Sequence, residues 1–193
     1  MGGTVLVTGG TGYIAGELID QLLAKGWTVR TTVRSTAKSE GKLRSRWPGA
    51  GEQLSVFEAE LMDDAGWAEA NTGCTHVAHV ASPIAVNTPK HEDEMIVPAR
   101  EGTLRALRFA RDAGATRFVQ TSSMAAVAYG RDEKVYTVSE ADWTNVDHPD
   151  VYPYIKSKTI AERAARDWVA AEGGGLEFVS VNPSMVVGPV YDA

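Results

Sequence analysis

The chain of 193 residues has a formal net charge of −6, with 44% hydrophobic and 23% charged residues. This composition is typical of a globular domain, and the scattered basic residues do not form the cluster that marks a DNA- or RNA-binding surface. No apolar run reaches the length of a membrane span, and the first residues lead into a strand-like segment rather than a signal sequence. Cys74 is the only cysteine, which excludes an intrachain disulfide. We therefore expect a cytoplasmic protein without nucleic-acid or membrane partners.

Apolar runs rich in β-branched residues alternate with helix-period segments along nearly the whole chain. Strands are predicted at residues 4–9, 27–34, 54–61, 75–82, 116–123 and 176–183, and helices at 13–26, 64–71, 96–113 and 154–172. Apolar strands separated by helices are typical of an α/β fold, in which a parallel sheet is covered on both faces. Right-handed connections make this a doubly wound sheet with ligands at the carboxyl ends of its strands. No linker divides residues 1–193, and the long irregular stretch 124–152 predicts a functional loop.

The sequence TGGTGYIAG follows the first predicted strand and opens the first predicted helix. It contains Gly10-x-Gly12-x-x-Ala15, whose glycines permit a tight turn and a close backbone approach to a pyrophosphate. The third small residue permits close packing of the helix on the strand, and the helix N-terminus faces the negative charge. An ordinary tight turn also contains glycines, but the strand–turn–helix context favours a dinucleotide-binding Rossmann fold.

The second predicted strand ends in Arg34, where NAD-binding domains usually carry an acidic residue for the ribose 2′-hydroxyl. A guanidinium binds a 2′-phosphate through two parallel hydrogen bonds, and Lys38 adds a second positive charge four residues later. The alternative is that both are solvated surface residues. The pattern favours NADP (NADPH) as the cofactor.

The segment YPYIKSK contains the spacing Tyr-x-x-x-Lys twice, as Tyr152 with Lys156 and as Tyr154 with Lys158. A residue before proline avoids the α region, so we expect Tyr152 outside the helix and Pro153 in its first turn. The helix phase then places Tyr154 and Lys158 on the buried face and Lys156 on the solvated face. An ammonium group beside a phenol favours the phenolate, so Tyr154 suits a proton donor to a carbonyl oxygen. Many helices carry such a pair without any catalytic role.

A metal site is not expected. His76 and His79 lie three residues apart on a predicted strand, and an odd separation directs their side chains to opposite faces. Cys74 has no basic partner near it in sequence and is expected to be a packed thiol.

Together, TGGTGYIAG, the strand end TSS, the helix entry YIKSK and the strand end NPSMVVGP resemble extended short-chain dehydrogenase/reductases. TVRSTAK, HVASP, EADWT and YIKSKTIAERAA narrow the resemblance to the dihydroflavonol, cinnamoyl-CoA and yeast-type aldehyde reductases of the NAD-dependent epimerase/dehydratase family. The resemblance implies NADPH-dependent reduction of a ketone or aldehyde on a small molecule, by a monomer or homodimer. The alternatives are a nucleotide-sugar epimerase or dehydratase of the same family and a non-catalytic NADP(H)-binding regulator.

The resemblance also assigns roles by position. It implies that Ser123 polarises the substrate, that Tyr154 is the general acid and also contacts the cofactor, and that Lys158 binds the ribose. The further cofactor-binding residues that it implies are Gly9, Thr11, Gly12, Tyr13 and Ile14 at the pyrophosphate, Glu60 and Leu61 at the adenine, Val80, Ala81 and Ser82 on the ribose side, Thr121 near the catalytic residues, and Pro183 and Val186 at the nicotinamide.

Two residues depart from the family pattern. Ala15 replaces the commoner glycine, and Glu60 replaces the usual aspartate beside the adenine. Members of the group also carry a small C-terminal substrate domain, whereas this sequence stops at VVGPVYDA. A fragment, a partial sequence and a natural short form are all compatible with that ending, and each leaves one wall of the substrate pocket outside these residues.

Overall fold

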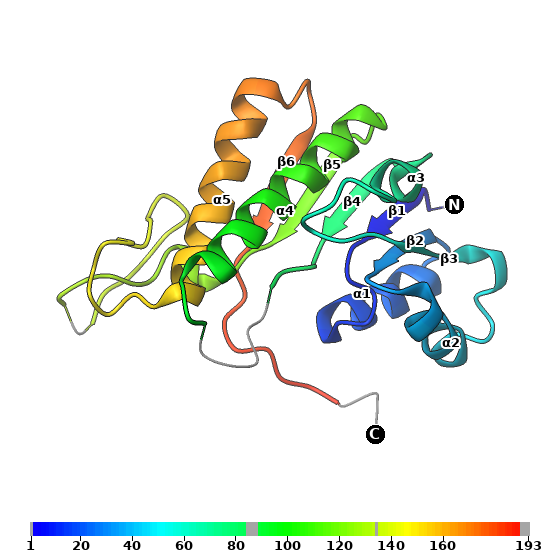
Figure 1. The fold of residues 1–193 in the computed structure, drawn as a ribbon, viewed down its shortest axis with the longest axis horizontal. Coiled ribbons are helices and arrows are strands. Elements are labelled where there is room, and N and C mark those ends of the chain that lie inside the picture. The colour runs from blue at the N-terminus through cyan, green and yellow to red at the C-terminus, as the bar shows by residue number, and fades with distance from the viewer. Residues whose placement is uncertain (1, 84–88, 134, 190–193) are drawn as a thin grey trace.

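The computed structural model describes residues 2–83, 89–133 and 135–189 (Figure 1). Six parallel strands form one sheet in the order β3-β2-β1-β4-β5-β6. The strands are β1 (Thr4–Val7), β2 (Thr28–Val33), β3 (Leu54–Glu58), β4 (His76–His79), β5 (Arg117–Thr121) and β6 (Glu177–Val181). The helices are α1 (Tyr13–Ala24), α2 (Thr36–Arg46), α3 (Trp67–Asn71), α4 (Asp93–Asp112) and α5 (Pro153–Glu172), with short 3-10 helices η1 (Gly51–Gln53) and η2 (Met124–Ala126). The predicted doubly wound Rossmann fold is confirmed.

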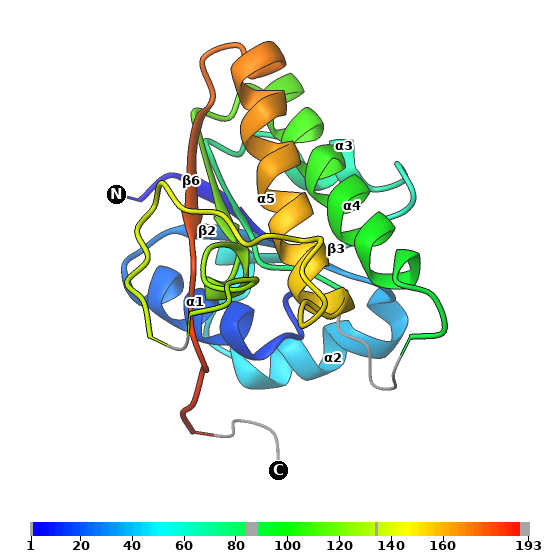
Figure 2. The same cartoon turned by 90° about the vertical axis from the view of Figure 1, so that its left-hand side faces the viewer.

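Helices cover both faces of the sheet because successive strand residues bury their side chains on opposite sides. On one face, Val7 packs in a cluster with Ile19 of α1 and Leu43 of α2. On the other face, Leu6 and Phe118 pack in a cluster that includes residues of α3, α4 and α5. Figure 2 shows α4 and α5 lying side by side along this second face. None of the helices in the described ranges is long and apolar enough to span a membrane.

Helix α2 is the element that the apolar pattern missed. Its sequence, TAKSEGKLRSR, buries only Leu43, so it lacks the apolar repeat of an amphipathic helix. Its start is fixed from outside the helix, because the carboxylate of Glu58 at the end of β3 accepts hydrogen bonds from the amide (2.9 Å) and hydroxyl (3.2 Å) of Thr36. A carboxylate at a helix N-terminus also interacts favourably with the helix dipole.

Other predicted boundaries were displaced by a few residues. Helix α4 begins at Asp93, three residues before the predicted start, since acidic residues are favoured in the first turn of a helix. The predicted strands ran past the observed ladders, because the apolar runs continue into the loops at the rim of the sheet. The irregular stretch 124–152 contains only η2 as a regular element among its described residues.

Candidate active site

The turn between β1 and α1 presents backbone rather than side chains at the rim of the sheet. Gly9 has a φ of +74°, a conformation that residues with a side chain rarely adopt, and a Cβ there would lie 3.2 Å from the Cβ of Ala81. A Cβ at Gly10 would lie 2.3 Å from Oγ1 of Thr31, which is too close for any side chain. Ala15, the third small residue of the motif, is completely buried.

The N-terminus of α1 has no side-chain cap. The amides of three glycines in the turn are occupied: Gly9 donates to the Thr32 hydroxyl (3.1 Å), Gly10 to the Thr32 carbonyl (2.9 Å) and Gly12 to the Gly9 carbonyl (2.8 Å). Within the described ranges the amides of Thr11 and Ile14 have no hydrogen-bond acceptor. Uncapped N–H groups at a helix N-terminus are suited to an anion, so the turn fits a pyrophosphate.

A cavity of about 1220 Å³ opens beside this turn, at the carboxyl ends of β1, β2, β3 and β4. The predicted cofactor residues that line it are Gly9, Thr11, Gly12, Tyr13, Ile14, Arg34, Glu60, Leu61, Val80, Ala81, Ser82 and Val186. Residues that no motif indicated also line it, namely Thr32, Val33, Ala59, Met62, Trp67, Pro83, Pro89, Lys90, Glu94 and Met95. Thr32, Val33 and Ala59 lie at the carboxyl ends of β2 and β3, where the rule that ligands bind at the ends of strands was the only sequence signal.

The remaining predicted cofactor residues lie outside the lining of this cavity. They are Lys38 on α2, Thr121 at the end of β5, Pro183 after β6, and Tyr154 and Lys158 on α5. The structure therefore divides the predicted site into two regions. We call the cavity around the glycine turn the cofactor half, and the ends of β5 and β6 with the first three turns of α5 the catalytic half.

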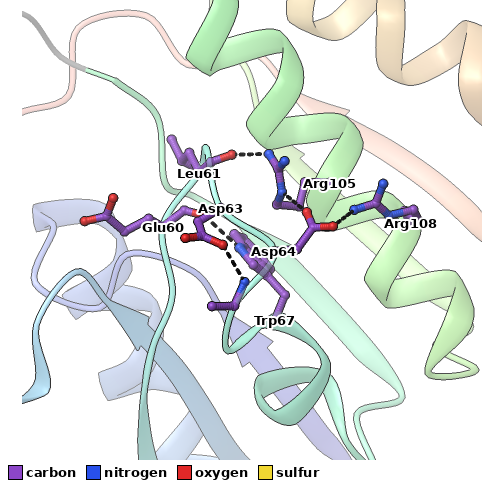
Figure 3. A network of polar contacts seen from close by, with 8 residues as sticks. Glu60, Leu61, Asp63, Asp64, Trp67, Arg105 and Arg108 are labelled. Atoms are coloured by element: carbon purple, nitrogen blue, oxygen red, sulfur yellow. Dashed lines mark hydrogen bonds and ion pairs between the residues drawn. The ribbon is translucent and has the colours of Figure 1, made fainter.

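In the cofactor half, Arg105 of α4 anchors the loop that follows β3 (Figure 3). Its guanidinium donates to the carbonyl of Leu61 and to the carboxylate of Asp64, which also accepts from Arg108 at 2.8 Å. The hydrogen bond from Arg105 is the main reason that the pKa of Asp64 lies below its ordinary value. A Cβ at Gly102 would lie 2.8 Å from the side chain of Leu61, so α4 approaches this loop closely.

The neighbouring carbonyl is also held. The indole Nε1 of Trp67 donates to the carbonyl of Glu60 at 2.8 Å, and Trp67 is 1% exposed. In Figure 3 the side chain of Glu60 points away from the arginines, toward the opposite side of the loop. Both carbonyls are thus bound to the protein, which holds Glu60 and Leu61 in place where they line the cavity.

In the catalytic half, α5 begins as the proline predicted. Tyr152 is the N-cap with extended backbone, and Pro153 occupies the first helical position. Tyr152 is 57% exposed, whereas Tyr154 packs against a buried cluster that includes Ala125. Lys156 forms a surface ion pair with Glu92 at 2.7 Å. The burial pattern therefore agrees with the predicted helix phase.

Lys158 is buried at the end of β5. It is 8% exposed, and its Nζ donates to the carbonyl of Thr121 at 3.3 Å. Burial lowers its pKa from 10.5 to about 8, because the low-dielectric surroundings disfavour the charged form. The side chain is thus still charged at neutral pH while being poorly solvated.

Ser123 is held in a defined orientation beside these residues. It is 8% exposed and is the N-cap of η2, where its Oγ accepts from the amide of Ala125 at 3.1 Å. Within the described ranges its hydroxyl hydrogen makes no hydrogen bond, so it is available to donate to a substrate oxygen. Ala125 belongs to the cluster against which Tyr154 packs, so the predicted serine and tyrosine share a neighbour.

A buried histidine at the end of β4 supports the glycine turn. Oγ1 of Thr8 accepts from the amides of Val80 (3.0 Å) and Ala81 (2.9 Å), so its single hydrogen must go to Nδ1 of His79 at 3.1 Å. Burial, together with the charge of Lys158, lowers the pKa of His79 to about 3. His79 is therefore neutral with its proton on Nε2, and Thr8 ties the glycine turn to the end of β4.

The other candidates discounted on sequence lie elsewhere. His76 packs against Trp27 in a T-shaped arrangement, on the opposite face of β4 from His79, as their spacing predicted. Cys74 is buried, and burial raises the pKa of its thiol to about 11. The residues that the structure describes contain no group of three or more potential metal ligands.

These features define a dinucleotide-binding domain with a serine, a tyrosine and a lysine at the strand ends. The chain belongs to the NAD dependent epimerase/dehydratase family, whose model matches residues 5–193. It is 36% identical over 197 residues to dihydroflavonol 4-reductase of Hordeum vulgare, covering 99% of this chain and 55% of that protein. It is 38% identical over 197 residues to cinnamoyl-CoA reductase CAD2 of Medicago truncatula, covering 98% of this chain and 60% of that protein.

Solved structures give the same result. The structure of Gre2 from Candida albicans in complex with NADPH matches with a TM-score of 0.85 and 30% identity, over 98% of this chain and 60% of that one. The predicted family and its reductase group are thereby confirmed. The chain spans little more than half the length of these relatives.

Proposed function

We propose that the protein containing these residues reduces a ketone or aldehyde group on a small molecule to an alcohol, with NADPH as the cofactor. The observation that carries the proposal is the position of Lys158. A buried ammonium at the end of β5 lies one helical turn from Tyr154, on the side of α5 that packs on the sheet. Burying a charge is unfavourable, and such groups concentrate at functional sites.

The cofactor half supports the choice of NADPH. The uncapped amides of the α1 N-terminus fit the pyrophosphate, and Arg34 lines the same cavity with a guanidinium suited to a 2′-phosphate. When bound, NADPH supplies the hydride that the substrate carbon gains. That the relative Gre2 was solved in complex with NADPH is consistent with this choice.

The catalytic half supplies the groups that act on the substrate oxygen. The amide of Ala125 donates to Oγ of Ser123, so the hydroxyl hydrogen of Ser123 points elsewhere. Ser123 donates this hydrogen to the substrate oxygen and so polarises the carbonyl group. Tyr154 transfers a proton to the same oxygen as it gains negative charge. Lys158 holds a positive charge beside the tyrosine, which favours the phenolate that remains.

A substrate panel tests the proposal. The full-length protein is incubated with NADPH and a series of ketones, aldehydes and nucleotide sugars, while NADPH absorbance and product formation are followed together. We expect one alcohol to form for each NADPH consumed. Product formed from a nucleotide sugar without net NADPH consumption would indicate the epimerase alternative. Tight NADPH binding without turnover of any substrate would indicate a regulator.

A further inference from the structure

A buried carboxylate lies one helical turn after Lys158 on α5. Glu162 is 2% exposed and accepts hydrogen bonds from Ser180 (2.7 Å), from Asn182 (2.9 Å) and from two nitrogens of Arg166 (2.9 and 3.1 Å). Burial raises the pKa of Glu162, but the hydrogen bonds around it outweigh this effect, so its pKa lies below the ordinary value. Glu162 is therefore an ionised group at neutral pH with donors on both oxygens.

Asn182 extends this network to the predicted catalytic serine. Its Nδ2 carries two hydrogens, one of which goes to Glu162 at 2.9 Å and the other to the carbonyl oxygen of Ser123 at 3.0 Å. A carboxylate can only accept, so Glu162 requires the amide of Asn182 to present its nitrogen rather than its oxygen. The same orientation places a donor at the carbonyl of Ser123.

The hydrogen bond from Asn182 is one of three that join the residues around Ser123, just after the end of β5, to the residues at the end of β6. On one side of Ser123, the amide of Ser122 donates to the carbonyl of Val181 at 2.9 Å. On the other side, the amide of Met124 donates to the carbonyl of Pro183 at 2.9 Å. Between them, the side chain of Asn182 provides the bond to the carbonyl of Ser123 itself. The backbone of Ser123 is thus fixed to the end of β6 at three consecutive points.

We propose that Glu162 is a positioning residue for Ser123, which acts through Asn182 to set the place of the serine hydroxyl. The inference rests on the proposed function, because it gives a reason why Ser123 must be held so firmly. Burying a charge is unfavourable, so a buried carboxylate that only orients one amide calls for a functional reason. In many functional sites, a residue that contacts the ligand is oriented by a hydrogen bond from a second residue behind it. A displacement of about 1 Å at such a site can cost on the order of 100-fold in rate.

Exchanging the hydrogen-bond donor and acceptor between positions 162 and 182 separates an effect on the position of Ser123 from an effect on stability alone. In Asn182→Asp, two carboxylates face each other and the bond to Ser123 is lost, so both Tm and kcat should fall. In Glu162→Gln/Asn182→Asp, the introduced glutamine donates to the introduced aspartate and still accepts from Arg166 and Ser180. The introduced aspartate has no hydrogen for the carbonyl of Ser123. We expect Tm to return toward the wild-type value while kcat stays about 10- to 100-fold low.

Ser180→Ala is the matched control, because it removes a hydrogen bond to the same carboxylate without touching Asn182 or Ser123. It should lower Tm and leave kcat within about twofold of wild type. Recovery of kcat together with Tm in the double variant would overturn the inference, as would an unchanged kcat in Asn182→Asp.

A second readout does not depend on turnover. The amide of Ala125 donates to Oγ of Ser123, so its hydrogen exchange, followed by NMR, reports on the serine directly. Exchange should be faster in the double variant by about tenfold and unchanged in Ser180→Ala. If no substrate is reduced but this exchange pattern is found, the proposed function fails and the positioning inference stands. If the Ala125 amide exchanges equally in all variants, the inference fails.

Discussion

The two halves of the site are built by different means. The cofactor half is formed by main chain and small residues: a glycine turn, an uncapped helix N-terminus and two loop carbonyls held by Arg105 and Trp67. The catalytic half is formed by polar side chains taken out of water, with Lys158 at 8% and Glu162 at 2% exposure. The first half suits a large ligand that makes many weak contacts, and the second suits a small reacting group that needs a few precise ones. Affinity and rate should therefore respond to different residues.

The largest expected effect is on rate in the catalytic half. Tyr154→Phe removes the proton donor while the ring keeps its packing against Ala125 and its neighbours. General acid catalysis contributes about 10²–10⁴-fold, so turnover should fall by that order. Tyr152→Phe is the matched control, because that side chain is 57% exposed and lies at the N-cap outside the helix. Steady-state kinetics that ranked Tyr152→Phe as the more damaging change would show that the helix phase has been misread.

The second effect concerns stability and its dependence on pH. Lowering the pKa of Lys158 from 10.5 to about 8 corresponds to roughly 3 kcal/mol of destabilisation of the charged form. Below about pH 8 the folded state bears this penalty in full. Between the folded and unfolded pKa values the folded state releases its proton first, so the wild type gains stability as pH rises. Lys158→Met removes the penalty and this pH dependence.

Urea unfolding of wild type and Lys158→Met checks this expectation. The variant should be the more stable protein at about pH 7, with the difference shrinking toward about pH 10. Titrating groups that do not interact with Lys158 are common to both proteins and cancel in the comparison. A variant that is less stable at neutral pH, with a parallel pH profile, would mean that the ammonium is well compensated in the fold.

The third effect is on affinity in the cofactor half. Arg34→Ala removes the guanidinium that lines the cavity, and hydrogen bonds to charged groups contribute about 1.5–3 kcal/mol. The Kd of NADPH should rise about 10- to 100-fold, with little change for NADH. Lys38→Ala should have a smaller effect, because Lys38 lies on α2 outside the cavity lining. Calorimetric titration of both cofactors measures this, and equal losses for NADPH and NADH would argue against a 2′-phosphate contact.

The smallest effect tests how Arg105 holds the loop that follows β3. Arg105→Met releases the carbonyl of Leu61, and we expect a Kd for NADPH that is higher by about two- to fivefold. Arg108→Met removes a contact to Asp64 but none to Leu61, so it should leave the Kd unchanged. Calorimetric titration with NADPH compares the Kd of the two variants. A similar loss in both variants would assign the effect to the charge of the arginines rather than to the position of the loop.

The contrast between the halves also explains what could be read from the sequence. The glycine turn was predictable because its geometry depends on neighbouring residues, and the burial of Lys158 was predictable because Pro153 fixed the start and phase of α5. Helix α2 was missed because a polar helix with one buried residue gives no apolar repeat.

The residues that hold the site residues in place could not be predicted from the sequence. Glu162 and Asn182 are twenty positions apart, and each is of a type usually found at the surface, so only the packing of α5 beside β6 brings them together. The same is true of Arg105, whose partner Leu61 lies forty-four positions earlier. Met95 and Lys90 line the cavity through the loop and helix that follow β4, without any motif.

One paired titration tests most directly whether the two halves are separate. The Kd of NADPH is measured by calorimetry for Tyr154→Phe and Arg34→Ala beside the wild type. We predict that Tyr154→Phe binds NADPH within about threefold of wild type, while Arg34→Ala binds at least about tenfold more weakly. A loss of affinity in Tyr154→Phe as large as that in Arg34→Ala would contradict the division of the site into a binding half and a catalytic half.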